Sequence, residues 1–160
     1  MAIKLTTEQV WQTLEKELFA VLGMVTAKGE ARTVGIVYIA HDKKLYIASN
    51  KETWKVRHIA ANPNVSITVT IPKRIPLMPF IKIPAATITF SGKARVLDAV
   101  DVSDAVKKLL LRGLDPQSEE IANMAIMEIE PVGNFITYGV GVSLMTMRTP
   151  ENARGRVPVA

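Results

Sequence analysis

The chain has 160 residues, no cysteine and a formal net charge of +5 at pH 7. This length predicts one domain, and 48% hydrophobic with 22% charged residues is typical of a globular rather than a disordered protein. Without cysteine, a disulfide scaffold, a thiol nucleophile and a thiolate metal site are excluded. The excess of positive charge favours anionic partners without identifying one.

Several classes of function are not favoured by the sequence. No apolar stretch approaches the ~20 residues that cross a bilayer, and residues 1–8 lack an apolar signal core, so we expect a cytoplasmic protein with no membrane partner. Aromatic residues are few and are not interleaved with the basic ones, which argues against nucleic acid. His41 and His58 have no carboxylate at ligand spacing, so no metal site is predicted.

Hydrophobic periodicity predicts strands and helices in a mixed order. Thr6 and Gln9 have capping-box spacing at the start of an amphipathic helix that would end near Ala20. Strands are expected at residues 21–27, 32–40, 45–48, 65–71, 86–96, 125–130 and 134–142. Helices are expected at 49–61 and 101–113, with another short one starting at Asp115-Pro116. Short polar turns between strands indicate antiparallel neighbours, and hence an α+β or closed-barrel domain.

Residues 72–84 contain four of the nine prolines, so they cannot form a central strand or a regular helix. A long irregular loop within a small domain is usually functional or disordered. Its isoleucine, leucine, methionine and phenylalanine content argues against disorder, because these side chains favour burial. Two interpretations remain: an arm that packs on its own or a partner subunit, and a lid over a cofactor.

A candidate anion site lies at residues 49–55, directly after a predicted strand. Ser49 and Glu52 have capping-box spacing, which predicts a helix start, and the first turn of a helix accommodates a phosphate with its free N–H groups. Lys51 and Lys55 are four residues apart and would repel each other on one helix face unless an anion lay beside them. The alternative is a solvated lysine face with an ordinary cap.

Two further polar features could belong to a binding site. Arg32 starts a predicted strand, and if the sheet curls, it would approach the Ser49 end of the next strand, where its guanidinium could clamp a phosphate. Alone, an arginine there is usually just exposed. Ser66, Thr68 and Thr70 form the polar face of a strand that could line a groove or simply meet solvent.

Five strings of residues, in this order, resemble the flavin-binding split-barrel family related to pyridoxamine 5'-phosphate oxidase. They are residues 19–26 (FAVLGMVT), 31–38 (ARTVGIVY), 44–49 (KLYIAS), 53–57 (TWKVR) and 62–69 (NPNVSITV). The resemblance implies an α+β, mainly β fold: a six-stranded antiparallel split barrel with peripheral helices. It also implies a homodimer with FMN in two clefts at the subunit interface. The barrel domain would cover residues 1–145, including the proline-rich insertion at 72–84, and residues 146–160 would be a basic tail.

The resemblance also implies which residues hold the flavin. The phosphate would be bound by Arg32, Thr53 and Lys55, with Ser49 and Asn50 nearby. Thr33, Val34 and Gly35 would lie along the ring system, and Trp54 is included among the cofactor-binding residues. No catalytic acid or base is implied. The expected function is that of an FMN-dependent oxidoreductase with a small-molecule redox substrate.

The chain departs from the oxidase itself at its C-terminal end. It has no W-x-x-x-R-L-x-P-like ending and no R-x-H, where the oxidase binds its phosphorylated substrate, so pyridoxamine phosphate oxidation is not expected. One alternative keeps the fold but binds a deazaflavin, whose acidic tail would contact basic residues: Lys73, Arg74, Lys82, Arg154 and Arg156. Another alternative is a non-catalytic module that holds flavin or haem.

Overall fold

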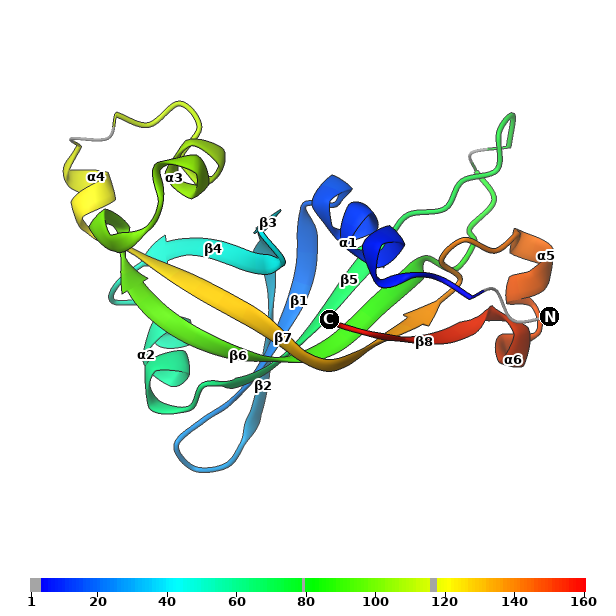
Figure 1. The fold of residues 1–160 in the computed structure, drawn as a ribbon, viewed down its shortest axis with the longest axis horizontal. Coiled ribbons are helices and arrows are strands. Elements are labelled where there is room, and N and C mark those ends of the chain that lie inside the picture. Colours follow the sequence, from blue (N-terminus) through cyan, green and yellow to red (C-terminus); the bar gives the residue numbers. More distant parts are fainter. Residues whose placement is uncertain (1–3, 79, 116–117) are drawn as a thin grey trace.

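The computed structural model describes residues 4–78, 80–115 and 118–160 (Figure 1). The helices are α1 (Thr7–Lys16), α2 (Trp54–Ala61), the 3-10 helix η1 (Ala99–Asp101), α3 (Asp104–Leu110), α4 (Glu119–Ala122), α5 (Leu144–Met147) and α6 (Pro150–Ala153). The strands are β1 (Phe19–Val25), β2 (Ala31–Val37), β3 (Ile39–His41), β4 (Lys44–Asn50), β5 (Asn64–Ile71), β6 (Ala86–Asp98), β7 (Met124–Tyr138) and β8 (Arg154–Pro158).

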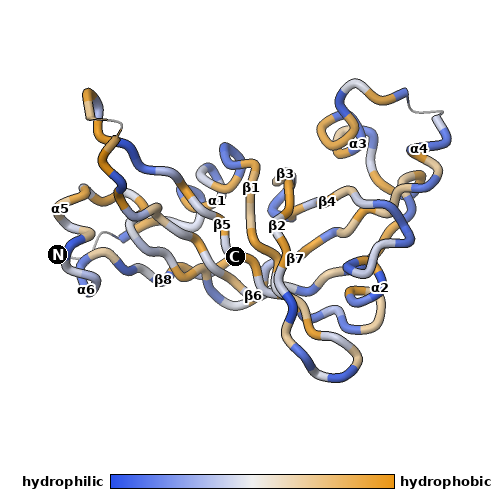
Figure 2. Tube along the Cα trace, turned by 180° about the vertical axis from the view of Figure 1, so that it is seen from behind, coloured by the Kyte–Doolittle hydropathy of each residue, from blue (hydrophilic) through white to orange (hydrophobic). Residues whose placement is uncertain are grey.

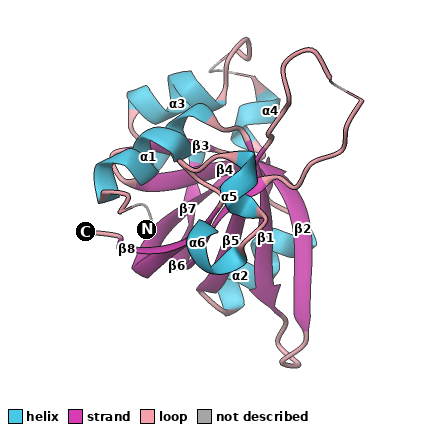
Figure 3. Ribbon diagram, turned by 90° about the vertical axis from the view of Figure 1, so that its right-hand side faces the viewer, coloured by secondary structure: helices cyan, strands magenta, loops and turns pink. Residues whose placement is uncertain are grey.

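All these strands join one curved antiparallel sheet. Its order is β2-β1-β5-β6-β7-β4-β3, and β8 pairs with β7 beside this path. The expected α+β, mainly antiparallel β class is confirmed, but the described residues contain eight strands rather than six. Buried residues of α1 and α2 belong to one hydrophobic core and those of α3 belong to another. Figures 1 and 3 show α1 and α2 well apart from each other along the curved sheet. In the part of the chain that the structure describes, no helix is long and apolar enough to cross a membrane.

The predicted start of α1 is confirmed, but its predicted end is wrong. The Thr6 hydroxyl accepts a hydrogen bond from the Gln9 N–H, and the Gln9 side chain accepts one from the Thr6 N–H, which completes the capping box. The helix ends at Lys16 rather than near Ala20. Residues from Phe19 onward alternate between buried and more exposed positions, as a half-buried strand requires, and they form β1.

The strand predicted at residues 32–40 is divided into β2 and β3 at Tyr38. The Tyr38 side chain is buried, its hydroxyl donates to the Leu14 carbonyl at 2.8 Å, and its N–H donates to the Leu18 carbonyl. These contacts turn the chain, so β2 pairs with β1, whereas β3 pairs with β4. Burial, together with the charge of Glu17, raises the pKa of Tyr38 far above its ordinary value, so the hydroxyl remains a hydrogen-bond donor.

The strand predicted at 125–130 and the first five residues of the strand predicted at 134–142 form one long strand, β7, which ends at Tyr138, so residues 139–142 are wrongly predicted as strand. Pro131 and Gly133 lie between the two predicted strands, and Gly133 adopts a positive φ of 76°. The ladder nevertheless continues, with Pro131 opposite Gly92 and a register shift where β6 and β7 pair near Thr89. The sequence therefore located the irregularity but not the continuity of the strand.

Two hydrophobic cores lie on opposite faces of β4. Leu45 and Ile47 belong to the main core, whereas Tyr46 belongs to a second core, because successive side chains of a strand point to opposite faces. In the main core the Phe135 ring, fully buried, makes edge-to-face contacts with Trp11 and Phe90 at centroid distances of 5.4 and 5.2 Å. The second core joins β4 to η1, α3 and α4.

In the last third of the chain, the observed helices and strand have different bounds from the predicted ones. The helix expected at 101–113 is shorter, because Ser103 caps α3 at its N-terminus and residues 99–101 form η1. A short helix is expected to start at Asp115-Pro116, but Pro116 lies outside the described residues. The helix that follows, α4, is capped by Ser118. Within the predicted basic tail, residues 154–158 form β8 and pair with β7.

The proline-rich segment at 72–84 extends away from the sheet (Figures 1 and 2). Leu77 is 97% exposed and Phe80 is 78% exposed, although both are large apolar side chains. Lys73 attaches the base of the segment by donating to the Val142 carbonyl at 2.6 Å. Met78 and Ile81 are also exposed, at 42% and 40%, whereas Ile75 and Ile83 are half-buried. Pro79 lies outside the described residues.

Candidate functional site

The candidate anion site predicted at residues 49–55 is a hydrogen-bonded bend between β4 and α2. The buried Ser49 hydroxyl lies 3.1 Å from that of Thr53, and Thr53 donates to the Asn50 carbonyl at 2.9 Å. The Asn50 side-chain oxygen accepts from the Glu52 N–H. The predicted Ser49–Glu52 capping box is wrong. Ser49 is still part of β4, where it lies opposite Ala125 of β7, and the N-cap of α2 is Thr53. The two predicted hydroxyls are nevertheless side by side at the helix start.

The N-terminus of α2 has free hydrogen-bond donors and no acid of its own. The Thr53 side chain makes no capping bond, and the first turn contains no Asp or Glu. Among the residues that the structure describes, the Trp54, Lys55 and Val56 N–H groups therefore have no side-chain acceptor at this end. Together with the positive end of the helix dipole, they provide a binding position for an anion.

The two lysines of this segment have different surroundings. Lys51 precedes the helix and forms an exposed ion pair with Asp98 at 2.8 Å, so the predicted repulsion with Lys55 along one helix face does not arise. Lys55 lies in the first turn of α2 and is half-buried, and no ion pair of Lys55 occurs within residues 4–78, 80–115 and 118–160. Lys55 is therefore the cation of this bend that is available to a ligand.

An aromatic pair lies on the same helix. The Trp54 ring contacts the His58 ring at a centroid distance of 5.6 Å, in an edge-to-face arrangement. Trp54 is 41% exposed, so part of the indole remains accessible beside the lysine-bearing turn. This partly exposed ring could contact the flat part of a ligand.

The second predicted group, Arg32–Gly35, lies in β2 at the edge of the sheet. Arg32 is half-exposed and pairs with the exposed Glu30 carboxylate at 2.8 Å. Arg32 and Thr33 line a depression of about 400 Å³ together with Ser66 and other residues of β5 and β6. Val34 is half-buried, and Gly35 faces the Phe19 ring, where an added Cβ would come within 3.0 Å.

The structure does not connect these two groups directly. The predicted approach of Arg32 to the Ser49 end assumed that their strands are neighbours, but β2 pairs with β1 and β4 pairs with β7 and β3. Among the hydrogen bonds and ion pairs of the described residues, none joins Arg32–Gly35 to the Ser49–Lys55 bend. Within one chain, therefore, the predicted meeting of Arg32 with the Ser49–Lys55 bend is not observed, and the depression beside Arg32 contains no residue of that bend.

The polar face of β5 meets its neighbours rather than a groove along most of its length. Thr68 lies 3.2 Å from Thr89 across the β5–β6 pair and is half-buried. Ser66 alone of the three predicted residues lines the depression beside Arg32. No group of three or more potential metal ligands was found in the residues for which the structure gives positions.

The sequence analysis missed a buried carboxylate, that of Glu128 on β7. It accepts hydrogen bonds from Arg95 at 2.7 Å, Lys44 at 3.1 Å and the Tyr46 hydroxyl at 3.2 Å. Burial raises the pKa of Glu128, but the bonds from Arg95 and Lys44 outweigh burial, and the net pKa is lowered. Burial, together with the charge of Glu128 and the hydrogen bond to it, raises the pKa of Tyr46 to about 12. No sequence signal could reveal this cluster, because it depends on the register of β4, β6 and β7.

Solved structures similar to this chain come from proteins with different functional descriptions. An F420 reductase has 18% identity and a TM-score of 0.54, with 78% of this chain and 93% of that chain covered. A heme binding protein from Mycobacterium smegmatis has 14% identity and a TM-score of 0.67, covering 99% of this chain and 60% of that chain. The General Stress Protein 26 from Bacillus anthracis has 20% identity and a TM-score of 0.54, covering 82% and 92%. At these identities the likeness concerns the fold.

Sequence comparison, unlike structural similarity, identifies one family. No protein with a curated description matches the chain. The sequence profile described as "Pyridoxamine 5'-phosphate oxidase" matches residues 6–135, which include β1 to β6, most of β7 and both predicted groups of cofactor residues. Since this match covers most of the chain, and the antiparallel sheet agrees with it, the chain belongs to the pyridoxamine 5'-phosphate oxidase family.

Proposed function

We propose that this protein is an FMN-dependent oxidoreductase that holds the FMN phosphate at the start of α2. The observation that carries the proposal is the set of unused donors there: the uncapped first-turn N–H groups and a half-buried Lys55 without an ion pair in the described chain. The Ser49 and Thr53 hydroxyls lie beside them but are already bonded to each other and to the Asn50 carbonyl. A phosphate monoester has acceptor oxygens and negative charge to match these donors. The residues present therefore fit the phosphate end of FMN.

The remaining predicted residues would contact the rest of the cofactor. Asn50 and Trp54 flank the bend, and the edge strand carrying Thr33, Val34 and Gly35 offers backbone groups to the ring system. The Arg32–Glu30 pair is exposed, and such a pair contributes only about 0–1 kcal/mol. Arg32 can therefore leave Glu30 for an anionic part of the cofactor at low cost, although within one chain no hydrogen bond or ion pair of the described residues joins it to the α2 start. When bound, the flavin supplies the hydride or electron transfer, while these residues bind and orient it.

We further propose that the functional form is a homodimer with cofactor clefts between the subunits. Large apolar side chains remain exposed on the single chain, above all Leu77 and Phe80, which a second copy could cover. Sedimentation velocity of a Leu77→Ser/Phe80→Ser variant tests this arrangement. We expect the variant to shift toward monomer, whereas Val100→Ser, which removes an apolar side chain exposed to the same 78% as Phe80, should not. Unchanged association of the loop variant would contradict this role of the loop.

The visible spectrum of the purified protein tests the central proposal. We expect flavin absorption bands, or saturable binding on titration of FMN into the apoprotein, and reduction of the bound flavin by NADH or NADPH. Absence of both bands and binding would refute the FMN proposal. A bound flavin that no nicotinamide donor reduces would instead support a non-catalytic flavin module. Pyridoxamine 5'-phosphate is not expected to be oxidised, because the chain lacks the C-terminal residues that the oxidase uses for it.

A second candidate is deazaflavin binding on the same fold, which the similarity to an F420 reductase supports. Arg154 and Arg156 are exposed on β8, and Arg74 and Lys82 are exposed in the proline-rich segment, so these cations remain available to an acidic cofactor tail. Lys73 is less available, because it donates to the Val142 carbonyl. Comparing the dissociation constants of FMN and F420 decides between them. A haem module, suggested by the heme binding protein, would show a Soret band instead.

A further inference from the structure

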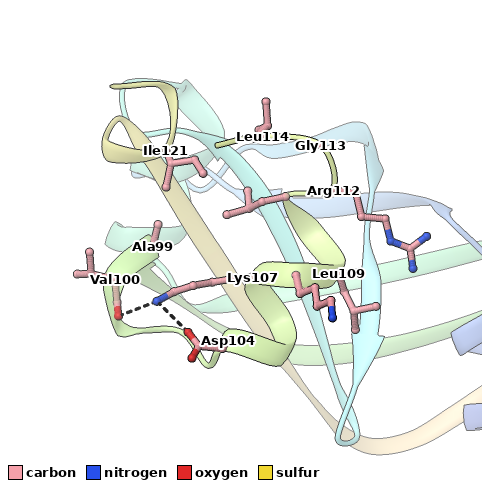
Figure 4. A pocket seen from close by; sticks show the side chains of 11 residues that line it. Ala99, Val100, Asp104, Lys107, Leu109, Arg112, Gly113, Leu114 and Ile121 are labelled. Atoms are coloured by element: carbon pink, nitrogen blue, oxygen red, sulfur yellow. Dashed lines mark hydrogen bonds and ion pairs between the residues drawn. The ribbon is translucent and has the colours of Figure 1, made fainter. Parts of the chain in front are cut away.

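A cavity of about 820 Å³ lies between η1, α3 and α4, on the side of β4 away from the main core (Figure 4). Its volume falls within the range of pockets that bind small molecules. Its lining shares no residue with Arg32–Gly35 or the Ser49–Lys55 bend. The cavity is therefore separate from the proposed FMN contacts, and its use does not depend on them.

Most of the cavity wall is apolar. The hydrocarbon side chains that line it are those of Ala99, Val100, Leu109, Leu111, Leu114 and Ile121. Several of them also belong to the second hydrophobic core, so the cavity continues that core outward instead of ending it at a polar surface. An apolar ligand body placed here would remove this wall from water, which is favourable.

The charged groups of the lining are mostly positive. Lys107, Lys108 and Arg112 are opposed by a single carboxylate, that of Asp104. Lys107 is already engaged, because its ammonium lies 3.8 Å from Asp104 and donates to the Val100 carbonyl at 3.2 Å. Lys108 and Arg112 form no hydrogen bond or ion pair within the described part of the chain. Two cations thus remain without a partner beside an apolar space.

The arrangement of these groups is that of an amphipathic site. Figure 4 shows Ala99 and Val100 at one end and Arg112 at the other, with Leu114 and Ile121 along the wall. Cations near the C-terminus of α3 also complement the helix dipole, so charge alone would not require a ligand. The apolar cavity beside these cations is the separate observation that points to a ligand.

We propose that this cavity binds an amphipathic organic anion, with its apolar body against the η1–α3–α4 wall and its anionic head at Lys108 and Arg112. A neutral apolar molecule would leave both cations without a counter-charge, and a small hydrophilic anion would leave the apolar wall exposed to water. A single-chain carboxylate satisfies both parts of the site. The protein would therefore have a second small-molecule site on its helical layer.

Isothermal titration calorimetry with dodecanoate, below its critical micelle concentration, tests the proposal on the intact protein. We expect saturable binding of one dodecanoate per chain. Acetate has the head without the chain, and dodecyltrimethylammonium has the chain with the opposite charge. Both should bind at least about tenfold more weakly than dodecanoate, and a factor of about ten corresponds to one charge-assisted contact. Equal binding of dodecanoate and dodecyltrimethylammonium would overturn the proposed headgroup contacts.

Variants locate the site. Lys108→Gln/Arg112→Gln should weaken dodecanoate binding about tenfold or more, and Val100→Asp, a change at an exposed lining position, should weaken it by charge repulsion. Lys4→Gln/Lys16→Gln removes the same charge from exposed positions at α1 and should leave binding unchanged. An equal loss in both double variants would indicate non-specific attraction and refute the site. FMN affinity should be the same in all of them, which separates this proposal from the proposed function.

Discussion

Two clusters of charged and polar groups in this molecule differ in how completely the chain satisfies them. Around Glu128, one buried carboxylate receives hydrogen bonds from Arg95, Lys44 and Tyr46, all within the same sheet. At the start of α2, by contrast, N–H groups and the Lys55 ammonium point to no acceptor in the described chain. The first cluster is complete without a ligand, and the second is not.

This difference distinguishes charged groups that the fold itself requires from charged groups that are candidates for ligand binding. A buried carboxylate must be paired, since an unpaired one would be strongly destabilising, so the Glu128 cluster follows from folding alone. The donors of α2 are near the surface, where water can satisfy them, and folding therefore does not require them to be paired. The comparison predicts that substitutions in the first cluster change stability, whereas those in the second change ligand binding.

The largest expected effect is on cofactor binding by Lys55→Ala. The substitution removes the charge-assisted contact to the phosphate and should raise the FMN dissociation constant by a factor that corresponds to about 1.5–3 kcal/mol. The free energy of unfolding without FMN should change by less than about 0.5 kcal/mol, since Lys55 has no ion pair to lose in the described chain. Fluorescence titration and urea denaturation measure the two quantities, with Lys16→Ala as the matched control. An unaltered FMN affinity would remove Lys55 from the site.

Glu128→Ala should have the opposite profile. It leaves Lys44 and the Tyr46 hydroxyl without their acceptor, and we expect the free energy of unfolding to fall by about 2 kcal/mol. The cost stays below that of a fully buried pair, because Lys44 and Arg95 can turn toward water. Urea denaturation of Glu130→Ala, an exposed carboxylate two residues along β7, provides the control. If both variants were equally stable, the cluster would not have the structural role assigned to it.

A smaller effect should distinguish the two helix starts. Thr6→Ala removes the side-chain cap of α1 and should destabilise the protein by about 1 kcal/mol. Its counterpart, Thr53→Ala, removes no capping bond from α2, so its main consequence should be weaker FMN binding through the lost hydroxyl. Thermal unfolding of both variants, with and without FMN, checks the contrast. A Thr53 variant that loses as much stability as the Thr6 variant and binds FMN normally would contradict it.

The sequence predicted the fold class and the composition of the α2 bend, because both depend on local pattern. The Thr6 capping box and the alternation in β5 are examples that need only neighbouring residues. What it missed depends on long-range register. The Ser49–Glu52 spacing fits a cap, but pairing with β7 keeps Ser49 extended, and the turn at Tyr38 separates β2 from β4. Glu128 became significant only through its neighbours on β4 and β6.

The pH dependence of stability gives the finest test of the comparison. The folded-state pKa of Glu128 is lowered relative to the unfolded chain, so the unfolded state binds the proton more tightly. The contribution of Glu128 to stability is therefore fully present above the unfolded pKa of about 4.3 and is lost as the pH falls through the folded-state value. Urea denaturation between pH 7 and pH 3 should show a shallower decline for Glu128→Gln than for the parent protein. FMN binding by that variant at pH 7 should be unchanged, because the Glu128 cluster has no part in holding the phosphate. Parallel pH curves for the two proteins would mean that folding does not lower the pKa of Glu128.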